Sequence, residues 1–451
     1  MKKFAILGIV SGFSMPPLCI TPLIILSYAE IFNLLISKGI SDRDKVLNLL
    51  LFLLFFNGCS MYWLYKPFLI ADMYIFIMPI LLLILFLYLS LFHLFGGYIY
   101  IKLINTNHIN PQFSPILFGI IFTLMDLLIG TLFGGFPWNF IGYSSAGFLP
   151  FIQSASFLTI YGINFLLFLI SGYIGLFLNS KKVKFIIAAV FIFAVNFLYG
   201  SYKLYCCNSC NLNKFDLSIV QTNTVQNQKW NPYFAALQLR NYISLTFKSQ
   251  KDHKSKLILW PEASFPYLVT KNSNLKRIFG GVLDDGQSLL FGTIFNENDA
   301  YYNSLVTIDS NCKMTNIYHK VKLTPFGEYI PFRFLPFIDK IANDNRDFKA
   351  GGKRDLIKIG NMNFLPLICY EVIFPIFDKK YDCIINIAND AWFDGTKGID
   401  QLFYISRFRA VESSTPLIRC SNAGISAIFD NCGRTIYKSK RGEESYFQLC
   451  N

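Results

Sequence analysis

Long apolar stretches dominate the first part of the chain, from residue 1 to about residue 205, and short basic clusters separate them. After residue 205 the pattern changes to short apolar runs that alternate with polar segments. A helix that spans a bilayer needs about twenty mostly apolar residues, whereas short apolar runs are typical of buried strands. We therefore predict a transmembrane helical domain over 1–205 and a mixed α/β domain over 206–451.

Seven stretches of the first domain meet or approach the length of a membrane span. They lie near 3–20, 21–38, 46–66, 72–101, 114–135, 155–178 and 183–201. Pro16, Pro17 and Pro22 interrupt the first two. Lys2 and Lys3 resemble the basic start of a signal peptide, but no small-residue cleavage site follows, so we expect a retained helix.

Basic residues between the spans predict the orientation of the chain. They stand at the chain start and after the second, fourth and sixth spans: Lys2, Lys3, Lys38, Arg43, Lys45, Lys102, Lys181, Lys182 and Lys184. The loop at 136–154 contains no charged residue. Because basic loops stay in the cytoplasm, the N-terminus is expected inside and, after an odd number of spans, residues 206–451 outside. In a bacterial inner membrane that outer side is the periplasm.

Composition agrees with a membrane protein. Hydrophobic residues make up 53% of the chain and charged residues 15%, which is too apolar for an ordinary soluble protein. The formal net charge of +13 fits basic cytoplasmic loops and attraction to anionic lipids. Nucleic-acid binding is the alternative for a basic chain, but the sequence has no basic helix and no aromatic–basic RNA motif. We therefore expect a bilayer as partner and no nucleic acid.

The eleven cysteines form no regular disulfide framework. Cys206, Cys207 and Cys210 cluster just past the last apolar stretch, but a metal site would need further ligands at a second spacing. We interpret the cluster as juxtamembrane cysteines without a role.

Asp126 is an acidic residue within the fifth apolar stretch. A carboxylate at membrane depth is costly and is by default a functional candidate. Because Asp126 stands near the outer end of its span, the alternative is that it reaches water.

The second domain has the pattern of strands that alternate with helices. Expected strands are 215–223, 256–260, SLLFGTIF, NSLVTI, 314–323, 364–368 and 383–389, and expected helices are 231–250 and an amphipathic helix over 399–414. Such alternation favours layered α/β structure.

Three polar residues stand at or near the ends of these strands. Glu262 follows KLILWP, Lys320 lies in the expected strand IYHKVKL, and Cys369 follows FLPLI at the start of a possible helix. Taken singly, a glutamate at such a place is more often a surface residue, a lysine is more often solvated, and a cysteine is more often part of the core. Strand ends in α/β layers converge, however, so the three side chains can meet in one pocket. There a thiolate attacks an acyl carbon, a carboxylate moves its proton and an ammonium stabilises the oxyanion. We expect the lysine charge and a helix N-terminus to lower the thiol pKa.

The sequence around these residues resembles the Glu–Lys–Cys signature of the nitrilase superfamily. The segments are LILWPEASFP around Glu262, YHKVKLTPFGEYIPF around Lys320 and LPLICYEVIFP around Cys369. More narrowly, they resemble the bacterial apolipoprotein N-acyltransferase family. So do the run at 389–430 and GFPWNFIGYS at 135–144, which a soluble nitrilase would lack. The resemblance covers nearly the whole chain, and its motifs occur in the family's order.

The resemblance implies an αββα nitrilase-like sandwich domain in the periplasm, joined to a multi-span α-helical membrane domain. It implies Glu262 as general base, Lys320 as charge stabiliser and Cys369 as nucleophile. The supporting or substrate-binding residues that it implies are Trp230, Glu328, Tyr370 and Glu371, with the backbone N–H of Tyr370 as an oxyanion donor.

The reaction implied in the same way has two steps. A phospholipid acyl chain passes to the cysteine as a thioester, and the α-amine of an apolipoprotein's diacylglyceryl-cysteine then accepts it as an amide. The expected partners are therefore a phospholipid donor and an apolipoprotein acceptor. No metal or organic cofactor is implied, and we expect a monomer. The loop after Trp230 and the segment 331–344 are candidate lids over the site.

The sequence departs from the family pattern at three places, and two alternative functions stay open. No apolar span follows Asp430, where the family has a further helix; Asp400 stands where a histidine is common, and Ile129 where an arginine is frequent. One alternative is a membrane-anchored nitrilase-type amidase that uses the same three residues. The other is a truncated, inactive copy that binds lipid or lipoprotein without turnover.

Overall fold

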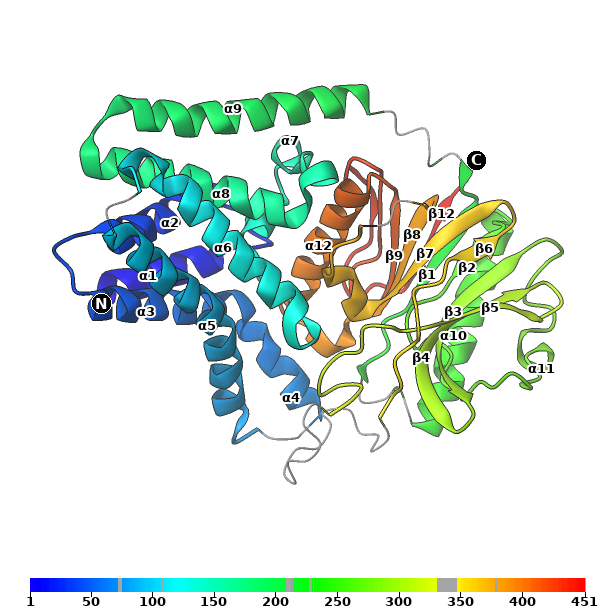
Figure 1. Cartoon of the computed structure of the whole chain (residues 1–451). Coiled ribbons are helices and arrows are strands. Elements are labelled where there is room, and N and C mark those ends of the chain that lie inside the picture. Colours follow the sequence, from blue (N-terminus) through cyan, green and yellow to red (C-terminus); the bar gives the residue numbers. More distant parts are fainter. Residues whose placement is uncertain are drawn as a thin grey trace.

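The computed structural model describes residues 1–71, 75–106, 109–207, 212, 214–226, 229, 231–330, 347–377 and 380–450. In it a bundle of helices lies beside a pair of packed β-sheets, and helix α12 stands between them (Figure 1). The predicted combination of a helical membrane domain and an αββα domain is therefore confirmed.

Apolar helices form the first half of the chain. They are α1 (Lys2–Phe13), α2 (Thr21–Ile36), α3 (Asp42–Met61), α4 (Tyr65–Ala71), α5 (Met78–Asn105), α6 (Ser114–Thr131), α7 (Leu149–Ile152), α8 (Ala155–Ser180) and α9 (Val183–Cys206). Within the described residues, five helical segments are long and apolar enough to cross a membrane: Asp42–Ile70, Met78–Asn105, Pro111–Gly134, Ala155–Ser180 and Val183–Cys206. Helix α2 is apolar but shorter, and the span count of seven stays a prediction.

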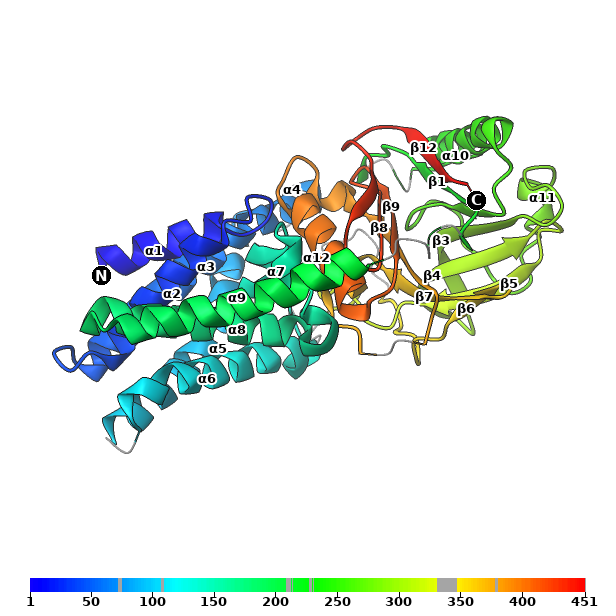
Figure 2. The ribbon, with the colours of Figure 1, turned by 90° about the horizontal axis from the view of Figure 1, so that it is seen from above.

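The long helices of the bundle run back and forth along one direction (Figure 2). The N-terminus and the turns between α2 and α3, α5 and α6, and α8 and α9 lie at the end that faces away from the sheets. These are the positions of the basic clusters in the sequence. Two ion pairs lie there: Lys3 with Glu30 at 2.6 Å and Lys102 with Asp42 at 3.0 Å.

Two six-stranded sheets form the second half. The strands are β1 (Leu217–Gln221), β2 (Leu257–Leu259), β3 (Ser288–Glu297), β4 (Ala300–Asp309), β5 (Met314–His319), β6 (Ile357–Ile359), β7 (Met362–Ile368), β8 (Cys383–Asn389), β9 (Leu417–Asn422), β10 (Ala427–Phe429), β11 (Thr435–Lys438) and β12 (Ser445–Leu449). The strand orders are β12-β1-β2-β3-β4-β5 and β11-β10-β9-β8-β7-β6. The central pairs β1–β2, β2–β3, β7–β8 and β8–β9 are parallel. Their strands are buried on both faces, which explains their nearly continuous apolar runs.

Side chains that alternate along the central strands pack into the layers on either side of each sheet. In β7, Phe364 and Ile368 face the first sheet, whereas Leu365 and Leu367 face α12 and the helical bundle. The outer face of the first sheet packs against α10 (Pro232–Asp252) and α11 (Lys276–Phe279). Because successive side chains in a strand point to opposite faces, each central strand contributes to two cores at once.

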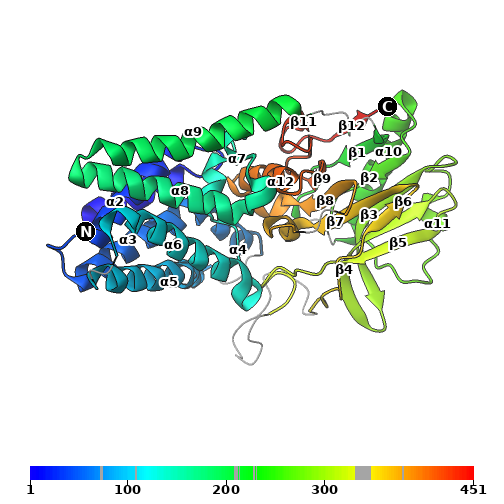
Figure 3. The same ribbon diagram turned by 45° about the horizontal axis from the view of Figure 1, so that its top comes forward.

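Helix α12 (Gly398–Ser413) lies between the second sheet and the helical bundle (Figure 3). The predicted helix at 399–414 is confirmed, but its amphipathic character is wrong, because almost every residue of α12 is buried. The side facing the bundle carries polar groups whose partners come from the bundle. Gln401 accepts hydrogen bonds from Trp63 Nε1 at 2.9 Å and Trp138 Nε1 at 2.8 Å, and donates to the Ser60 carbonyl at 2.9 Å.

Glu412 makes a second polar link at the other end of α12. Its Oε1 accepts the backbone N–H of Ile160 at 2.9 Å, next to Thr159, whose φ of +61° breaks the helical geometry of α8. Its Oε2 accepts from the N–H of Ile376 at 3.2 Å and pairs with Arg409. Glu412 therefore satisfies backbone groups of both halves that would otherwise be buried without a partner.

A disulfide joins Cys207, just past the end of α9, to Cys432 in the turn between β10 and β11. The interpretation of the cysteine cluster as without a role is thus wrong for Cys207. Cys206 is free and exposed, and Cys210 lies outside the described residues. The two bonded cysteines are 225 residues apart in sequence, so spacing gave no sign of the pair.

We expect removal of the disulfide with Cys207→Ser or Cys432→Ser to destabilise the protein by about 2–4 kcal/mol, because the crosslink restricts the unfolded chain. For a chain of this length this corresponds to an apparent Tm in detergent that is lower by about 2–4 °C. Cys206→Ser, one residue away, is the matched control and should leave the Tm unchanged. An equal Tm for all three variants and the native chain would show that the bond adds no stability.

Candidate active site

The three polar residues expected to form the site all lie just past the ends of strands, two of them in the first sheet (β2 and β5) and one in the second (β7). Glu262 follows β2 and Cys369 follows β7 directly. Lys320 was expected inside a strand, which is wrong: β5 ends at His319, and Lys320 is the next residue. Lys320 therefore lies just past a strand end, as Glu262 and Cys369 do. Functional side chains in α/β layers commonly lie at such strand ends.

Glu262 and Glu328 face each other across Asn303 of β4. The Asn303 amide donates to Glu262 Oε1 at 2.7 Å and to Glu328 Oε1 at 2.6 Å. Both carboxylates are nearly buried, with 7% and 8% of their residues exposed. One amide group therefore fixes the separation of two carboxylates that would otherwise repel each other.

Lys320 supplies the positive charge between these carboxylates. Its ammonium lies 2.9 Å from Glu328 Oε2 and 3.8 Å from Glu262 Oε1, and the residue is 1% exposed. Burial alone lowers the pKa of Lys320, but the attraction of the Glu328 and Glu262 carboxylates outweighs burial and raises it overall. Lys320 is thus held as a cation, and Glu328 is its main partner.

Cys369 begins a tight turn and is only partly exposed. Its φ of +49° lies in the left-handed region, which is costly for a residue with a side chain and aims the thiol out of the strand direction. The expected helix after Cys369 is wrong, since a five-residue 3-10 turn, Cys369–Ile373, follows instead.

The expectation of a lowered thiol pKa is also wrong. Burial raises the pKa of Cys369 well above its usual range, and the Glu262 carboxylate adds to the rise, while Lys320 opposes it with a smaller effect. The thiol is therefore neutral at rest, and forming a thiolate requires that its proton be taken by a neighbouring base.

Glu371 holds the turn Cys369–Ile373 against the segment that follows Lys320. Its carboxylate is fully buried and accepts from the N–H groups of Ile368, Val321 and Lys322 at 2.8, 2.9 and 3.1 Å. The Tyr318 hydroxyl donates to it as well, at 2.9 Å. Glu371 therefore acts as a buried anchor within the structure rather than as an open reactive carboxylate.

Tyr370 connects the turn to the helical bundle. Its hydroxyl donates to the Gly135 carbonyl at 3.1 Å, and its ring packs near Phe136, both within the GFPWNF motif. Trp230 and the segment 331–344, expected as a site residue and as a lid, lie outside the described residues. Asp400 pairs with Arg441.

Two residues of the site were missed at the sequence level. Asn303 bridges the carboxylates, and Lys229 is a fully buried lysine whose ammonium donates to the Glu262 carbonyl at 3.1 Å. Neither stands at a strand end that the apolar pattern marks. Only its place beside the expected Trp230 could have drawn attention to Lys229.

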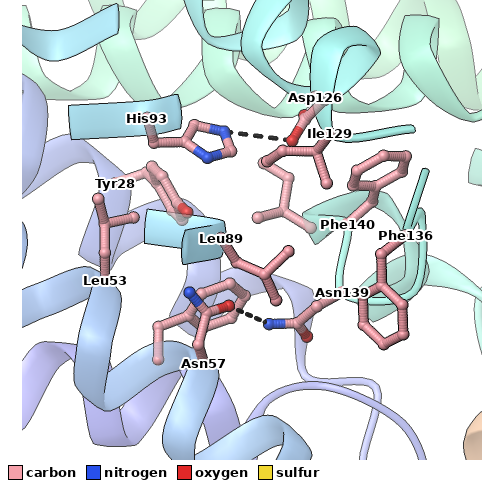
Figure 4. A pocket seen from close by; sticks show the side chains of 12 residues that line it. Tyr28, Leu53, Asn57, Leu89, His93, Asp126, Ile129, Phe136, Asn139 and Phe140 are labelled. Carbon is pink, nitrogen blue, oxygen red and sulfur yellow. Dashed lines mark hydrogen bonds and ion pairs between the residues drawn. The ribbon is translucent and has the colours of Figure 1, made fainter. Parts of the chain in front are cut away.

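Asp126 lies in a small cavity inside the bundle rather than in contact with water, as 2% of the residue is exposed (Figure 4). Its Oδ1 is 3.2 Å from His93 Nε2, and its Oδ2 accepts from the Asn164 amide at 2.8 Å. Across the cavity, Asn139 donates to Asn57 at 2.8 Å. The alternative in which Asp126 reaches water is therefore wrong.

Comparison with known proteins covers both halves. The family model for the apolipoprotein N-acyltransferase N-terminal domain matches residues 7–173, and the model for carbon-nitrogen hydrolase matches residues 217–448. The apolipoprotein N-acyltransferase of Allorhizobium ampelinum is 33% identical over 69% of this chain and 62% of its own length. That of Rickettsia typhi is 32% identical over 75% of this chain and 70% of its own length. The alignments thus span about two thirds of these relatives.

Among solved structures, the alignment with a CN-hydrolase superfamily protein from Xanthomonas campestris covers 52% of this chain and 89% of that protein. It is 18% identical, with a TM-score of 0.38.

We expect Asp126→Leu to destabilise the protein by about 2–4 kcal/mol, because it removes the carboxylate that contacts His93 Nε2 and accepts from the buried Asn164 amide. The double variant His93→Leu with Asp126→Leu should lose less than the sum of the two single changes. Apparent Tm in detergent measures both, with Leu127→Ala on the exposed side of α6 as control. Additive losses would contradict a coupled pair.

Proposed function

The chain belongs to the apolipoprotein N-acyltransferase family, and from this premise we propose that it transfers a fatty acyl chain from a phospholipid to the N-terminal α-amine of a diacylglyceryl-cysteine in apolipoproteins. The transfer passes through a thioester on Cys369. One observation carries the proposal: buried Glu262 and Lys320, the second of them ion-paired with Glu328, act electrostatically on a cysteine whose turn is bonded to the membrane half through Tyr370 and Gly135.

In the first step, Glu262 takes the Cys369 proton while the sulfur attacks the ester carbonyl of the phospholipid. This coupling is required because burial keeps the thiol neutral. The carbonyl oxygen becomes an oxyanion, which the Lys320 ammonium and the backbone N–H of Tyr370 stabilise. When the intermediate collapses, the carbon–oxygen bond breaks and Glu262 returns the proton to the leaving lysophospholipid oxygen. Glu328 keeps Lys320 charged throughout.

In the second step, the α-amine of the acceptor attacks the thioester carbonyl. Glu262 now removes a proton from the amine, the carbon–sulfur bond breaks, and the thiol of Cys369 is restored when it recovers a proton. The products are the amide of the triacylated lipoprotein and the free enzyme. Both half-reactions therefore use the same base, the same cation and the same sulfur.

The membrane half places the site next to its lipid substrate. Moving an acyl chain of about sixteen carbons into water would cost on the order of 12 kcal/mol, at about 0.8 kcal/mol per CH₂. A cysteine that acts on such chains must therefore lie at the bilayer, and the contact of Tyr370 with the GFPWNF segment supports that position.

We further propose that the catalytic half faces the periplasm of a bacterial inner membrane. The basic loops gather at the end of the bundle away from the sheets, which the positive-inside rule places in the cytoplasm. The Cys207–Cys432 disulfide supports the same orientation, because disulfides persist in oxidising compartments such as the periplasm.

A reconstituted transfer reaction tests the proposal. The full-length protein in vesicles of phosphatidylethanolamine and phosphatidylglycerol, with the donor acyl chain isotopically labelled, should form a labelled thioester on Cys369 and release lysophospholipid. Added diacylglyceryl-cysteine peptide should then receive the label as an amide. We expect Cys369→Ala to abolish both steps and Glu262→Gln to slow thioester formation by about 10²-fold or more.

Cys312→Ala, on the outer side of the first sheet, is the matched control and should retain transfer. Hydrolysis of small amides without a lipid thioester would favour the amidase alternative. Equal rescue of an acyltransferase-depleted bacterium by the native chain and by Cys369→Ala would favour an inactive binding copy.

A further inference from the structure

Lys229 is an unusual lysine because none of it is exposed. Lysine is almost never fully buried unless its charge is paired. Its ammonium donates to the backbone carbonyl of Glu262 at 3.1 Å. Among the described residues, no carboxylate oxygen lies within ion-pair distance of it, whereas Lys320 has two. A buried cation is thus hydrogen-bonded to the backbone of Glu262, the proposed general base.

The turn that carries Glu262 is closely packed and fixed from several sides. Ala263 adopts a φ of +48°, and the N–H of Gly292 donates to the Pro261 carbonyl at 3.1 Å. A Cβ on Gly292 would come within 2.6 Å of the Glu262 Cα. The Lys229 bond adds to this support, because it holds the Glu262 carbonyl at the centre of the turn.

Charge balance gives Lys229 a second role. Glu262 and Glu328 bring two negative charges to the pocket, and Lys320 balances only one of them. Transfer of the Cys369 proton to Glu262 moves a negative charge onto sulfur and then onto the substrate oxygen without changing the total. A second cation keeps the pocket neutral at each of these stages, and in a buried site an unbalanced charge is costly.

We propose that Lys229 is a positioning residue that holds the Glu262 turn and supplies the second positive charge of the pocket, so that it promotes thiolate formation at Cys369. The inference rests on the proposed acyl transfer for its biological meaning. Its effect on the thiol does not depend on which acyl donor or acceptor is used.

The surroundings of the pocket allow a pH dependence to be stated. Burial lowers the pKa of Lys229 to about 8, although Glu262 and Cys369 pull it upward. The other charges that act on Cys369 are Glu262, Lys320, Asp390 and Arg419. Asp390 and Arg419 pair with each other at 2.7 Å, so their effects on the thiol oppose each other. Lys229 is therefore charged below pH 8 and loses its charge as the pH rises above 8.

Alkylation of Cys369 by iodoacetamide tests the proposal on the full-length protein in detergent. Peptide mass spectrometry follows Cys369 from about pH 6 to about pH 9.5, and the exposed Cys206 in the same molecule is the internal reference. We expect Lys229→Met to slow alkylation of Cys369 about tenfold at pH 7, equivalent to about one unit in the thiol pKa. Lys229→Arg, which keeps the charge, should stay within about threefold of the native rate.

A second comparison remains decisive if Lys229→Met does not fold. Above pH 8 the native rate should rise less steeply with pH than that of Lys229→Arg, because arginine keeps its charge. Equal slopes for the two proteins, or a folded Lys229→Met with the native pH profile, would overturn the proposal. If Cys369 in the Lys229→Arg protein is alkylated as slowly as in Lys229→Met, then the charge of Lys229 has no role and the proposal is overturned.

The alkylation readout is independent of acyl transfer. If the native chain formed no lipid thioester while Lys229→Met still slowed alkylation, the proposed function would fail and the role of Lys229 would stand. A native thioester with unchanged alkylation in Lys229→Met would support the proposed function and overturn the role of Lys229.

Discussion

The structure depends on the burial of polar groups of α12 between two apolar layers. Gln401 and Glu412 lie inside the protein, where an unpaired polar group costs about 1–3 kcal/mol. Their partners belong to the helical bundle on one side and to the nucleophile segment on the other. Neither half can therefore satisfy its buried groups alone, and the two halves form one continuous core.

This constraint also fixes the turn that carries Cys369. Helix α12 packs on the turn Cys369–Ile373, and Glu412 holds the N–H of Ile376 just beyond it. Tyr370 reaches in the other direction to Gly135. The proposed nucleophile, Cys369, is thus attached to the bundle through its own turn rather than through a flexible linker. Such attachment suits a reaction in which an acyl chain must stay in lipid while its carbonyl carbon meets a thiol.

Sequence patterns predicted most of the strands and the approach of Glu262 to Lys320, because alternation and apolar runs are local properties of the chain. They failed where partners are distant in sequence. The segment 399–414 was expected to be amphipathic, but Gln401 and Glu412 bond to groups of the helical bundle that lie more than 250 residues earlier in the chain. For the same reason, the sequence did not predict the Cys207–Cys432 disulfide, the bridging role of Asn303 or the burial of Lys229. The raised pKa of Cys369 follows from burial, which no short motif reports.

Hydrogen exchange of the full-length protein in detergent tests most directly whether α12 docking holds the nucleophile. Gln401→Leu leaves the Trp63 and Trp138 N–H groups and the Ser60 carbonyl unpaired, whereas Gln448→Leu removes a similar set of bonds to Ser249 and His253 within the catalytic half. We expect Gln401→Leu to speed exchange at 135–140 and 369–376, and Gln448→Leu to affect only β12 and α10. Unchanged exchange at 369–376 in Gln401→Leu would contradict the account.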